Sequence, residues 1–412
     1  MADNYQIIKG GKLIYGLDKE PLNNAYVVIK NDKIVETGRK EEVNLPSGEN
    51  VKIYDAKNKT IMPGLIDTHT HLQLVPEENE LDVLQKTIPY KTLQTRFNAV
   101  STLKAGFTTI RDLGAENLVD LAVRDAINDD LSLGPRILAS GYKVIPTGAD
   151  FQIYPPRVSI DGRKTMDSPA EIRKHVRKLV AMGVDQIKVM TSGRTFRKSS
   201  SPDAQTFSLE EMKTAVDEAH NHDKKVSAHA HGSKGVKLAL EAGCDTIEHG
   251  TELDCEDIEF MIENNIFLIP TFSYGKKVEK LKKKSGLPNY IIEKTLKSRK
   301  KRLDSFRRAI EAGVKVAMGS DSGMPFVYHG TNAFELTEFI KAGMNSFEAI
   351  ITATSNAAAA LGIEEKTGTI EKGKLADIIV VKGDPLDDIN VLTERENIKF
   401  VFKEGEIVFN NV

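Results

Sequence analysis

The chain contains the stretch Pro63-Gly64-Leu65-Ile66-Asp67-Thr68-His69-Thr70-His71, an apolar strand that ends in two histidines separated by one residue. Residues i and i+2 of a strand project to the same face, so the imidazoles of His69 and His71 can reach one metal ion together. An isolated His-x-His pair is more often a pair of exposed polar residues. Further ligand-type residues, each ending its own apolar strand, favour the metal interpretation: Lys188, His229, His249 and Asp321.

Strand-like runs alternate with amphipathic helices through the middle of the chain, a pattern typical of a parallel sheet. Capping boxes support the helices, because Ser168 and Ser208 each stand three residues before a glutamate. Eight is the number of strands that closes a (β/α)8 barrel. We count eight runs, at residues 65–71, 107–113, 136–144, 185–191, 225–231, 246–250, 266–272 and 314–321.

Both ends of the chain carry a different pattern, made of short apolar strands and turns. We therefore predict an α/β protein in which residues 1–62 and 366–412 together form one small β-sandwich. Residues 63–365 form the predicted (β/α)8, or TIM, barrel. The terminal strands are expected at residues 6–9, 12–15, 25–30, 33–37, 377–381, 398–402 and 406–409.

The composition is that of an ordinary globular protein, with 412 residues, 40% apolar and 28% charged residues and a net charge of −2. This balance indicates neither a nucleic-acid nor a membrane partner. The start of the chain lacks the basic and apolar regions of a secretory signal, so we expect a cytoplasmic protein. A small molecule is the expected partner, and a homo-oligomer is left open.

Two further features are interpreted as structural. Cys244 and Cys255 are too few for a disulfide framework and are expected to be buried thiols. The basic runs between Lys276 and Arg308 alternate with apolar residues. This alternation predicts two helices whose charges face solvent.

Side chains at the C-terminal ends of barrel strands converge on one mouth, so the ligand-type residues are expected to meet there. The set resembles the amidohydrolase superfamily, in particular its binuclear members with a bridging carboxylated lysine. The likeness covers nearly the whole chain, including the split sandwich and the late segment Lys374-Leu375-Ala376-Asp377-Ile378-Ile379-Val380. The resemblance implies that one zinc ion is bound by His69, His71 and Asp321, a second by His229 and His249, and both by carboxylated Lys188.

The bridging role implied for Lys188 has a physical rationale. An ammonium inside a barrel beside two divalent cations would be a buried, repelled charge. Reaction with carbon dioxide converts it into an anionic carbamate that can bridge two metal ions. A lone strand lysine is normally ion-paired or reaches solvent, but amid this ligand set we expect N6-carboxylysine at position 188.

The resemblance implies hydrolysis of an amide or peptide bond by a hydroxide that bridges the two metal ions. Asp321 would accept the proton of that hydroxide and pass it to the leaving amine. The nearest likeness is to prolidase-like and arginine-carboxypeptidase-like enzymes, which implies a dipeptide or an N-acyl amino acid as substrate. Those relatives usually carry a Gly-Gly-His segment after the third strand, where this chain reads Ile145-Pro146-Thr147-Gly148-Ala149-Asp150. This departure concerns the substrate rather than the metal chemistry.

Three more residues are candidates for substrate contacts. His231 shares the strand face of His229 but lies two residues nearer the barrel mouth. Tyr274 follows the seventh strand, and His329 follows the Asp321 loop. We expect His231 to be the strongest of the three.

Two rival functions remain open at this point. The first is a mononuclear deaminase or a cyclic-amide hydrolase of the imidazolonepropionase type. Deaminases of this fold commonly place a glutamate three residues after the fifth-strand histidine, whereas Gly232 occupies that position here, and Lys188 also argues against them. The second is a structural relative without catalysis, which would typically have lost some of the ligands that this chain keeps.

Overall fold

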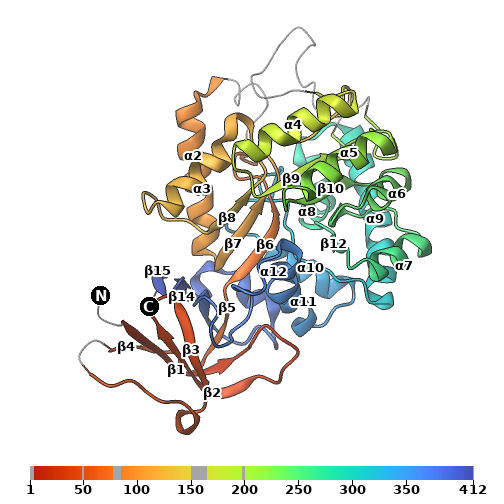
Figure 1. Cartoon of the computed structure of the whole chain (residues 1–412). Helices are drawn as coiled ribbons and strands as arrows, with labels where there is room; N and C mark the ends of the chain where they lie inside the picture. Colours follow the sequence, from red (N-terminus) through yellow and green to blue (C-terminus); the bar gives the residue numbers. More distant parts are fainter. Residues whose placement is uncertain (1–3, 49–50, 78–84, 150–164, 197–199, 412) are drawn as a thin grey trace.

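The computed structural model describes residues 4–48, 51–77, 85–149, 165–196 and 200–411. One eight-stranded sheet is built from both ends of the chain, in the order β15-β14-β13-β5-β1-β2-β3, with β4 also paired to β1. The first and last strands of the chain, β1 and β15, both belong to this sheet (Figure 1). Its strands are β1 (Tyr5–Leu13), β2 (Leu22–Lys30), β3 (Lys33–Gly38), β4 (Val51–Asp55), β5 (Lys59–Pro63), β13 (Ile378–Lys382), β14 (Ile398–Lys403) and β15 (Glu406–Asn410).

This joint sheet agrees with the predicted sandwich of the two ends. Strand β13 shows how it attaches to the rest of the molecule, because successive side chains of a strand point to opposite faces. Ile379 and Val381 pack into the cluster that contains Leu65 and Phe107 of the central region. Ile378 and Val380 pack into a separate cluster within the terminal sheet. Burial on both faces explains why the strand reads as an unbroken apolar run.

The central region contains two parallel sheets surrounded by helices (Figure 1). One sheet consists of β6 (Leu65–Thr70), β7 (Phe107–Asp112) and β8 (Arg136–Ala139). The other consists of β9 (Gln186–Met190), β10 (Lys225–Ala230), β11 (Thr246–His249) and β12 (Phe267–Ile269). The helices are α2 (Ile88–Lys104), α3 (Val119–Asn128), α4 (Pro169–Ala181), α5 (Leu209–His220), α6 (Ser233–Ala242), α7 (Cys255–Glu263), α8 (Ser273–Leu281), α9 (Asn289–Ala312), α10 (Phe334–Ala342), α11 (Ser346–Thr352) and α12 (Ser355–Leu361).

Backbone contacts join the two parallel sheets at both edges. Val144 pairs with Val189 of β9 just beyond the end of β8. At the other edge, the extended segment 314–322 lies between β12 and β6, where Val316 pairs with Leu268 and Ser322 pairs with Thr70. Consecutive strands and this segment therefore follow one another in the order that the predicted barrel requires.

The eighth predicted strand differs from the expectation, because segment 314–322 forms isolated bridges instead of a continuous ladder. Its backbone leaves the extended conformation at Asp321, which has a φ of 59°. Gly319 also lies so close to β6 that a Cβ there would be 2.6 Å from the Cβ of His69. The segment is thus shaped by its approach to the first strand, a constraint that strand propensity does not contain.

The two cysteines differ in burial. Cys244 is buried as predicted, but Cys255 is exposed in the first turn of α7. The expectation for Cys255 was wrong, because the residue follows the N-cap Asp254 at the exposed start of α7. No helix in the described parts of the chain combines the length and the apolar character needed to cross a membrane.

Gly64 is required at the junction between the terminal sheet and β6. Its N–H donates to the carbonyl of Asp377 at 2.9 Å, and a Cβ at this position would lie 2.2 Å from Oγ1 of Thr108. We predict that Gly64→Ala lowers the free energy of unfolding by about 1–3 kcal/mol, the usual cost of overpacking. Chemical denaturation measures the loss. The double variant Gly64→Ala/Thr108→Ala should regain part of it, and full additivity of the two changes would contradict the steric explanation.

Candidate metal centre

One cavity lies at the C-terminal ends of β6, β9, β10 and β11, beside the segment that carries Asp321. All of the side chains predicted as metal ligands line it and are buried. The sequence places them far apart, and the fold brings them together at one mouth, as expected for strand ends. These residues are His69, His71, Lys188, His229, His249 and Asp321.

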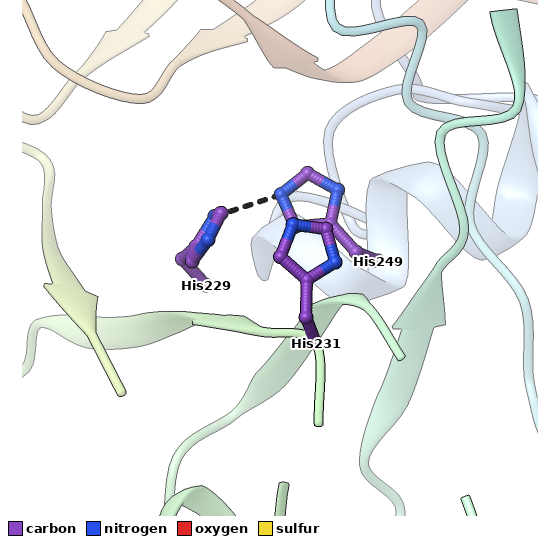
Figure 2. A group of neighbouring side chains, drawn as sticks. All are labelled: His229, His231 and His249. Carbon is purple, nitrogen blue, oxygen red and sulfur yellow. Dashed lines mark hydrogen bonds between the residues drawn. The ribbon is translucent and has the colours of Figure 1, made fainter. Parts of the chain in front are cut away.

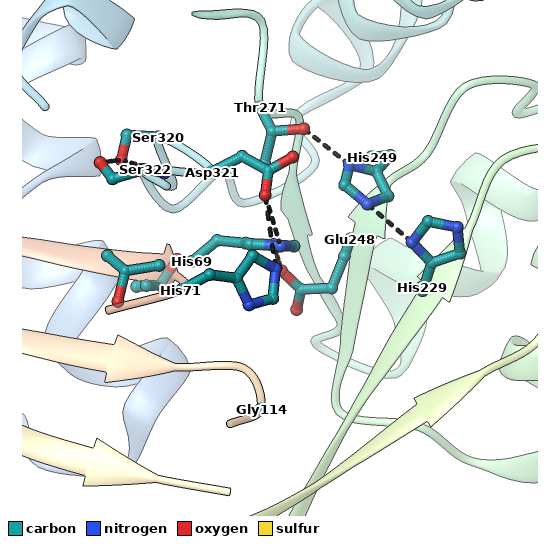
Figure 3. A network of polar contacts seen from close by, with 12 residues as sticks. His69, His71, Gly114, His229, Glu248, His249, Thr271, Ser320, Asp321 and Ser322 are labelled. Atoms are coloured by element: carbon teal, nitrogen blue, oxygen red, sulfur yellow. Dashed lines mark hydrogen bonds and ion pairs between the residues drawn. The ribbon is translucent and has the colours of Figure 1, made fainter. Parts of the chain in front are cut away.

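His69, His71 and Asp321 form one half of the cluster (Figure 3). The Nε2 atoms of His69 and His71 each lie 3.5 Å from Oδ1 of Asp321. Two ligands bound about 2.0–2.1 Å from a tetrahedral ion are roughly 3.3 Å apart. Each of the two histidine nitrogens is therefore spaced from the carboxylate oxygen as two ligands of one ion would be.

His229 and His249 form the other half, and His231 lies beside them (Figure 2). Nε2 of His249 is 2.9 Å from Nδ1 of His229. Each of the three histidines offers a nitrogen within 4.8 Å of nitrogens of the other two. His69, His249 and Asp321 satisfy the same distance limit, so the two halves are contiguous.

Burial keeps the imidazoles of the site neutral. It lowers the pKa of His71, His229, His231 and His249 well below the ordinary value. Burial also lowers the pKa of His69, against the opposing effect of Asp321 and Glu248. A neutral imidazole keeps a nitrogen lone pair, which a metal ion requires.

Lys188 has a buried amine that makes no hydrogen bond to the described residues. Burial lowers the pKa of this amine to about 7, with Glu248 opposing the shift. A large fraction of the side chain is therefore a neutral amine near neutral pH.

The outer nitrogens of two histidines are held by other side chains (Figure 3). Nδ1 of His249 lies 2.7 Å from Oγ1 of Thr271, and Nδ1 of His69 lies 2.6 Å from Oε2 of Glu248. Such partners leave the Nε2 atoms directed into the cavity. Thr271, His249 and Asp321 also have positive φ values of 51°, 72° and 59°. Backbone strain of this kind is concentrated at functional sites.

The three candidates for substrate contacts are placed differently. His231 and Tyr274 line the cavity. His231 is fixed by Oγ1 of Thr251, which lies 2.9 Å from its Nδ1. His329 is not among the lining residues of the described part of the chain, and its Nε2 lies 3.0 Å from the carbonyl oxygen of Leu74.

Sequence analysis missed several residues of the site, above all the arginines. Arg302 was expected to face solvent on a basic helix, but it is buried, lines the cavity and donates to the carbonyl of Thr271 at 2.6 Å. Thr295, Ser298 and Arg302 lie three and four residues apart on α9 and so share one face of the helix, which lines the cavity. This polar face was the sequence signal that could have identified Arg302. Arg194 and Arg299 line the same cavity.

The order of the strands, the split terminal sheet and the donor set agree with one family of proteins. The sequence model of that family, described as the amidohydrolase family, matches residues 60–408. The chain belongs to the amidohydrolase family.

Similar members include ochratoxinase of Aspergillus niger, which is 31% identical over 97% of this chain and 86% of the relative. The crystal structure of A. niger ochratoxinase has a TM-score of 0.89 and covers 99% of this chain and 96% of the other. A Xaa-Pro dipeptidase with bound methionine is 33% identical, with a TM-score of 0.87 over 98% and 99% of the two chains. A prolidase complexed with N-methylphosphonate-L-proline is 27% identical, with a TM-score of 0.89 over 99% and 100%.

The donor set fits divalent metal ions, as is typical of amidohydrolases. Neutral imidazoles and one carboxylate offer the nitrogen and oxygen donors that zinc accepts. Nδ1 of His71 and Nε2 of His229 lack hydrogen-bond partners among the described residues, so lone pairs remain available. The buried amine of Lys188 is the one member that needs chemical change to become a ligand.

We predict that Lys188→Ala removes at least one metal ion per chain. The reason is that the alanine variant loses the one lysine among the described lining residues, and carbon dioxide can convert only such an amine into a bridging carbamate. Elemental analysis of protein prepared with zinc and bicarbonate measures the content. Lys213→Ala, on the exposed face of α5, is the control and should leave the content unchanged. An unchanged metal content of the Lys188 variant would exclude the bridging role.

Proposed function

We propose that this protein is a binuclear zinc amidohydrolase that cleaves the amide bond of a small dipeptide or N-acyl amino acid. The observation that supports it most strongly is the convergence of six ligand-type side chains on one buried mouth. Zinc bound there would lower the pKa of water and polarise the scissile carbonyl. We further propose that the two parallel sheets and segment 314–322 form a (β/α)8 barrel over residues 63–365, with residues 1–62 and 366–412 as the sandwich.

Lys188 would act as the bridge between the two halves. Its neutral amine attacks carbon dioxide, a nitrogen–carbon bond forms, and one proton is released to solvent. The product is an N6-carboxylate with two oxygen donors. The lowered pKa of Lys188 favours this reaction, because only the unprotonated amine is a nucleophile.

Asp321 would move the proton during hydrolysis. Its Oδ1 lies 3.5 Å from Nε2 of both His69 and His71, so it would stand beside a water bound at this half of the site. The carboxylate accepts a proton from the water that attacks the carbonyl carbon. It then donates that proton to the leaving nitrogen, whose bond to carbon breaks.

The lining of the cavity favours a substrate with a negative charge and an apolar group. Arg194 and Arg302 contribute positive charge, whereas Arg299 is paired with Glu338 at 3.1 Å. Asp321 is the one carboxylate among the described lining residues. Phe196, Tyr274 and Met324 supply apolar surface; the first two rings lie 5.1 Å apart. A free carboxylate on the leaving amino acid matches the positive charge of the cavity. The side chain or acyl group of the substrate matches its apolar surface.

The names of the relatives support the same substrate class, since one is a Xaa-Pro dipeptidase and another a prolidase with a proline phosphonate bound. At the position of the Gly-Gly-His segment this chain has a loop that is hydrogen-bonded to Asp167. Thr147 in this loop donates from its N–H to Oδ1 of Asp167 at 2.8 Å, and no residue in the described part of the loop lines the cavity. Asp150 lies outside the described residues. His231 is therefore our candidate for the carboxylate.

The substrate class is tested with a panel of dipeptides and N-acyl amino acids, each paired with its C-terminal amide, on zinc-loaded protein. We expect hydrolysis of members with a free carboxylate. Hydrolysis restricted to the uncharged amides would contradict the peptidase assignment and leave only a hydrolase of neutral amides.

We predict that Asp321→Asn lowers kcat by roughly two orders of magnitude or more, the scale of losing a general acid and base. Asparagine keeps the shape of the side chain and can still offer an oxygen to a metal ion. Steady-state kinetics on protein of measured zinc content makes the comparison. Near-normal turnover at full zinc content would leave Asp321 as a ligand alone.

We predict that His231→Ala raises KM strongly for substrates with a free carboxylate and changes KM little for their amides. The expectation follows from the position of His231 beside His249 and Arg302 at the cavity wall. His222→Ala is the control, because this histidine is exposed just after α5 and does not line the described cavity. Equal effects of His231→Ala on both kinds of substrate would refute the assignment.

A further inference from the structure

A fully buried ion pair lies behind the metal-binding mouth, made by Arg111 of β7 and Glu248 of β11. Both side chains are at most 1% exposed, and Nη2 of Arg111 lies 2.7 Å from Oε1 of Glu248. Neither residue belongs to the predicted ligand set. Burying two charges is costly, and a pair of this kind is weak evidence for stability by itself.

Glu248 uses its second oxygen for a ligand of the metal site. Its Oε2 lies 2.6 Å from Nδ1 of His69, while Oε1 also accepts a hydrogen bond from Thr246 at 2.6 Å. An ionised carboxylate can only accept hydrogen bonds. The guanidinium of Arg111, 2.7 Å from Oε1, provides the positive partner of this carboxylate. Nδ1 of His69 is the donor that Oε2 can accept from, which leaves the lone pair of Nε2 for a metal ion.

Arg111 connects this carboxylate to the strands that carry the other ligands. Its guanidinium donates to the carbonyl of Thr68, the residue before His69 on β6. It also donates to Oε1 of Gln186 at 3.4 Å and to Oγ1 of Thr246 at 3.2 Å. Gln186 stands two residues before the predicted ligand Lys188 on β9. Thr246 stands three residues before the predicted ligand His249 on β11. Strand β7 thus offers no ligand itself but fixes β6, β9 and β11 relative to one another.

We propose that Glu248, held by Arg111, is a positioning residue that fixes the tautomer and ring orientation of His69 for metal binding. The inference rests on the metal centre proposed above. A purely structural ion pair would satisfy both carboxylate oxygens without using a metal ligand. Here one oxygen is directed at the outer nitrogen of His69, the arrangement by which carboxylates orient metal-bound imidazoles.

The Nδ1 atoms of the ligand histidines have different hydrogen-bond partners, so the proposal applies to His69 in particular. His249 has a neutral hydroxyl, that of Thr271, at its outer nitrogen. Nδ1 of His71 has no partner among the described residues. Glu248 therefore acts on the half of the site formed by His69, His71 and Asp321. The half that contains His229 and His249 depends on Thr271 instead.

The test compares Glu248→Gln with wild-type protein by competition with a chelator for zinc, with metal content measured at each step. Glutamine keeps the size of the side chain but removes the charge that Arg111 and His69 share. We expect one of two zinc ions to bind 10–100-fold more weakly, about the effect of losing such a partner, and the other to be unchanged. Thr271→Val should weaken the other ion. Equal affinities of wild-type and Glu248→Gln protein for both ions would overturn the proposal.

Controls separate this proposal from the proposed function and from loss of folding. Wild-type protein that binds no zinc would defeat the metal centre itself, whatever the variant does. Glu335→Gln alters another buried carboxyl, one held by the N–H groups of Phe272 and Ser273, and should leave both zinc affinities unchanged. Weaker binding of both ions in Glu335→Gln and Glu248→Gln alike would indicate a general structural effect and overturn the specific role.

A measurement on wild-type protein covers the case in which Glu248→Gln does not fold. Nitrogen NMR of protein labelled in histidine reports which ring nitrogen carries a proton, and His69→Gln identifies the resonance. We expect His69 to carry its proton on Nδ1 both without metal and with zinc. A proton on Nε2 in the metal-free protein would show that Glu248 does not set the tautomer.

Discussion

Burial of the donor set at one mouth is the constraint on which the rest of the site depends. Lys188 and the ligand histidines are removed from water at the ends of separate strands. Their lowered pKa values are the direct result of that burial. Neutral nitrogens held 2.9 to 3.5 Å from neighbouring donor atoms are prepared for metal ions rather than for protons.

Two features of the surrounding structure hold the donor set in place, namely strained backbone and buried arginines. Left-handed backbone at His249, Thr271 and Asp321 turns the side chains toward the cavity at the ends of their segments. Buried arginines then hold these turns in place, since Arg302 donates to Thr271 and Arg111 binds Glu248. Strain and desolvation near the mouth are offset by the apolar core between the sheets and the helices.

Much of this could be predicted from the sequence, because local patterns determine it. The His69-x-His71 spacing, the apolar strands and the capping serines are local signals, and the structure contains the elements they predict. Tertiary contacts determine what the sequence did not show. Segment 314–322 departs from a strand because it approaches β6, and Arg302 is buried because α9 covers the cavity. Glu248 and Arg111 looked like ordinary strand residues until the fold placed them against His69.

The substrate is the part least determined by local pattern. Cavity walls come from α8, α9 and the loop that carries Arg194, and their charges depend on packing between elements distant in sequence. The metal centre is more directly accessible to experiment. A crystal structure of the zinc-loaded protein, with anomalous scattering recorded at the zinc edge, tests it most directly. The account predicts one peak beside His69, His71 and Asp321, a second beside His229 and His249, and carboxylate density on Lys188 between them. A single peak with an unmodified Lys188 would contradict it.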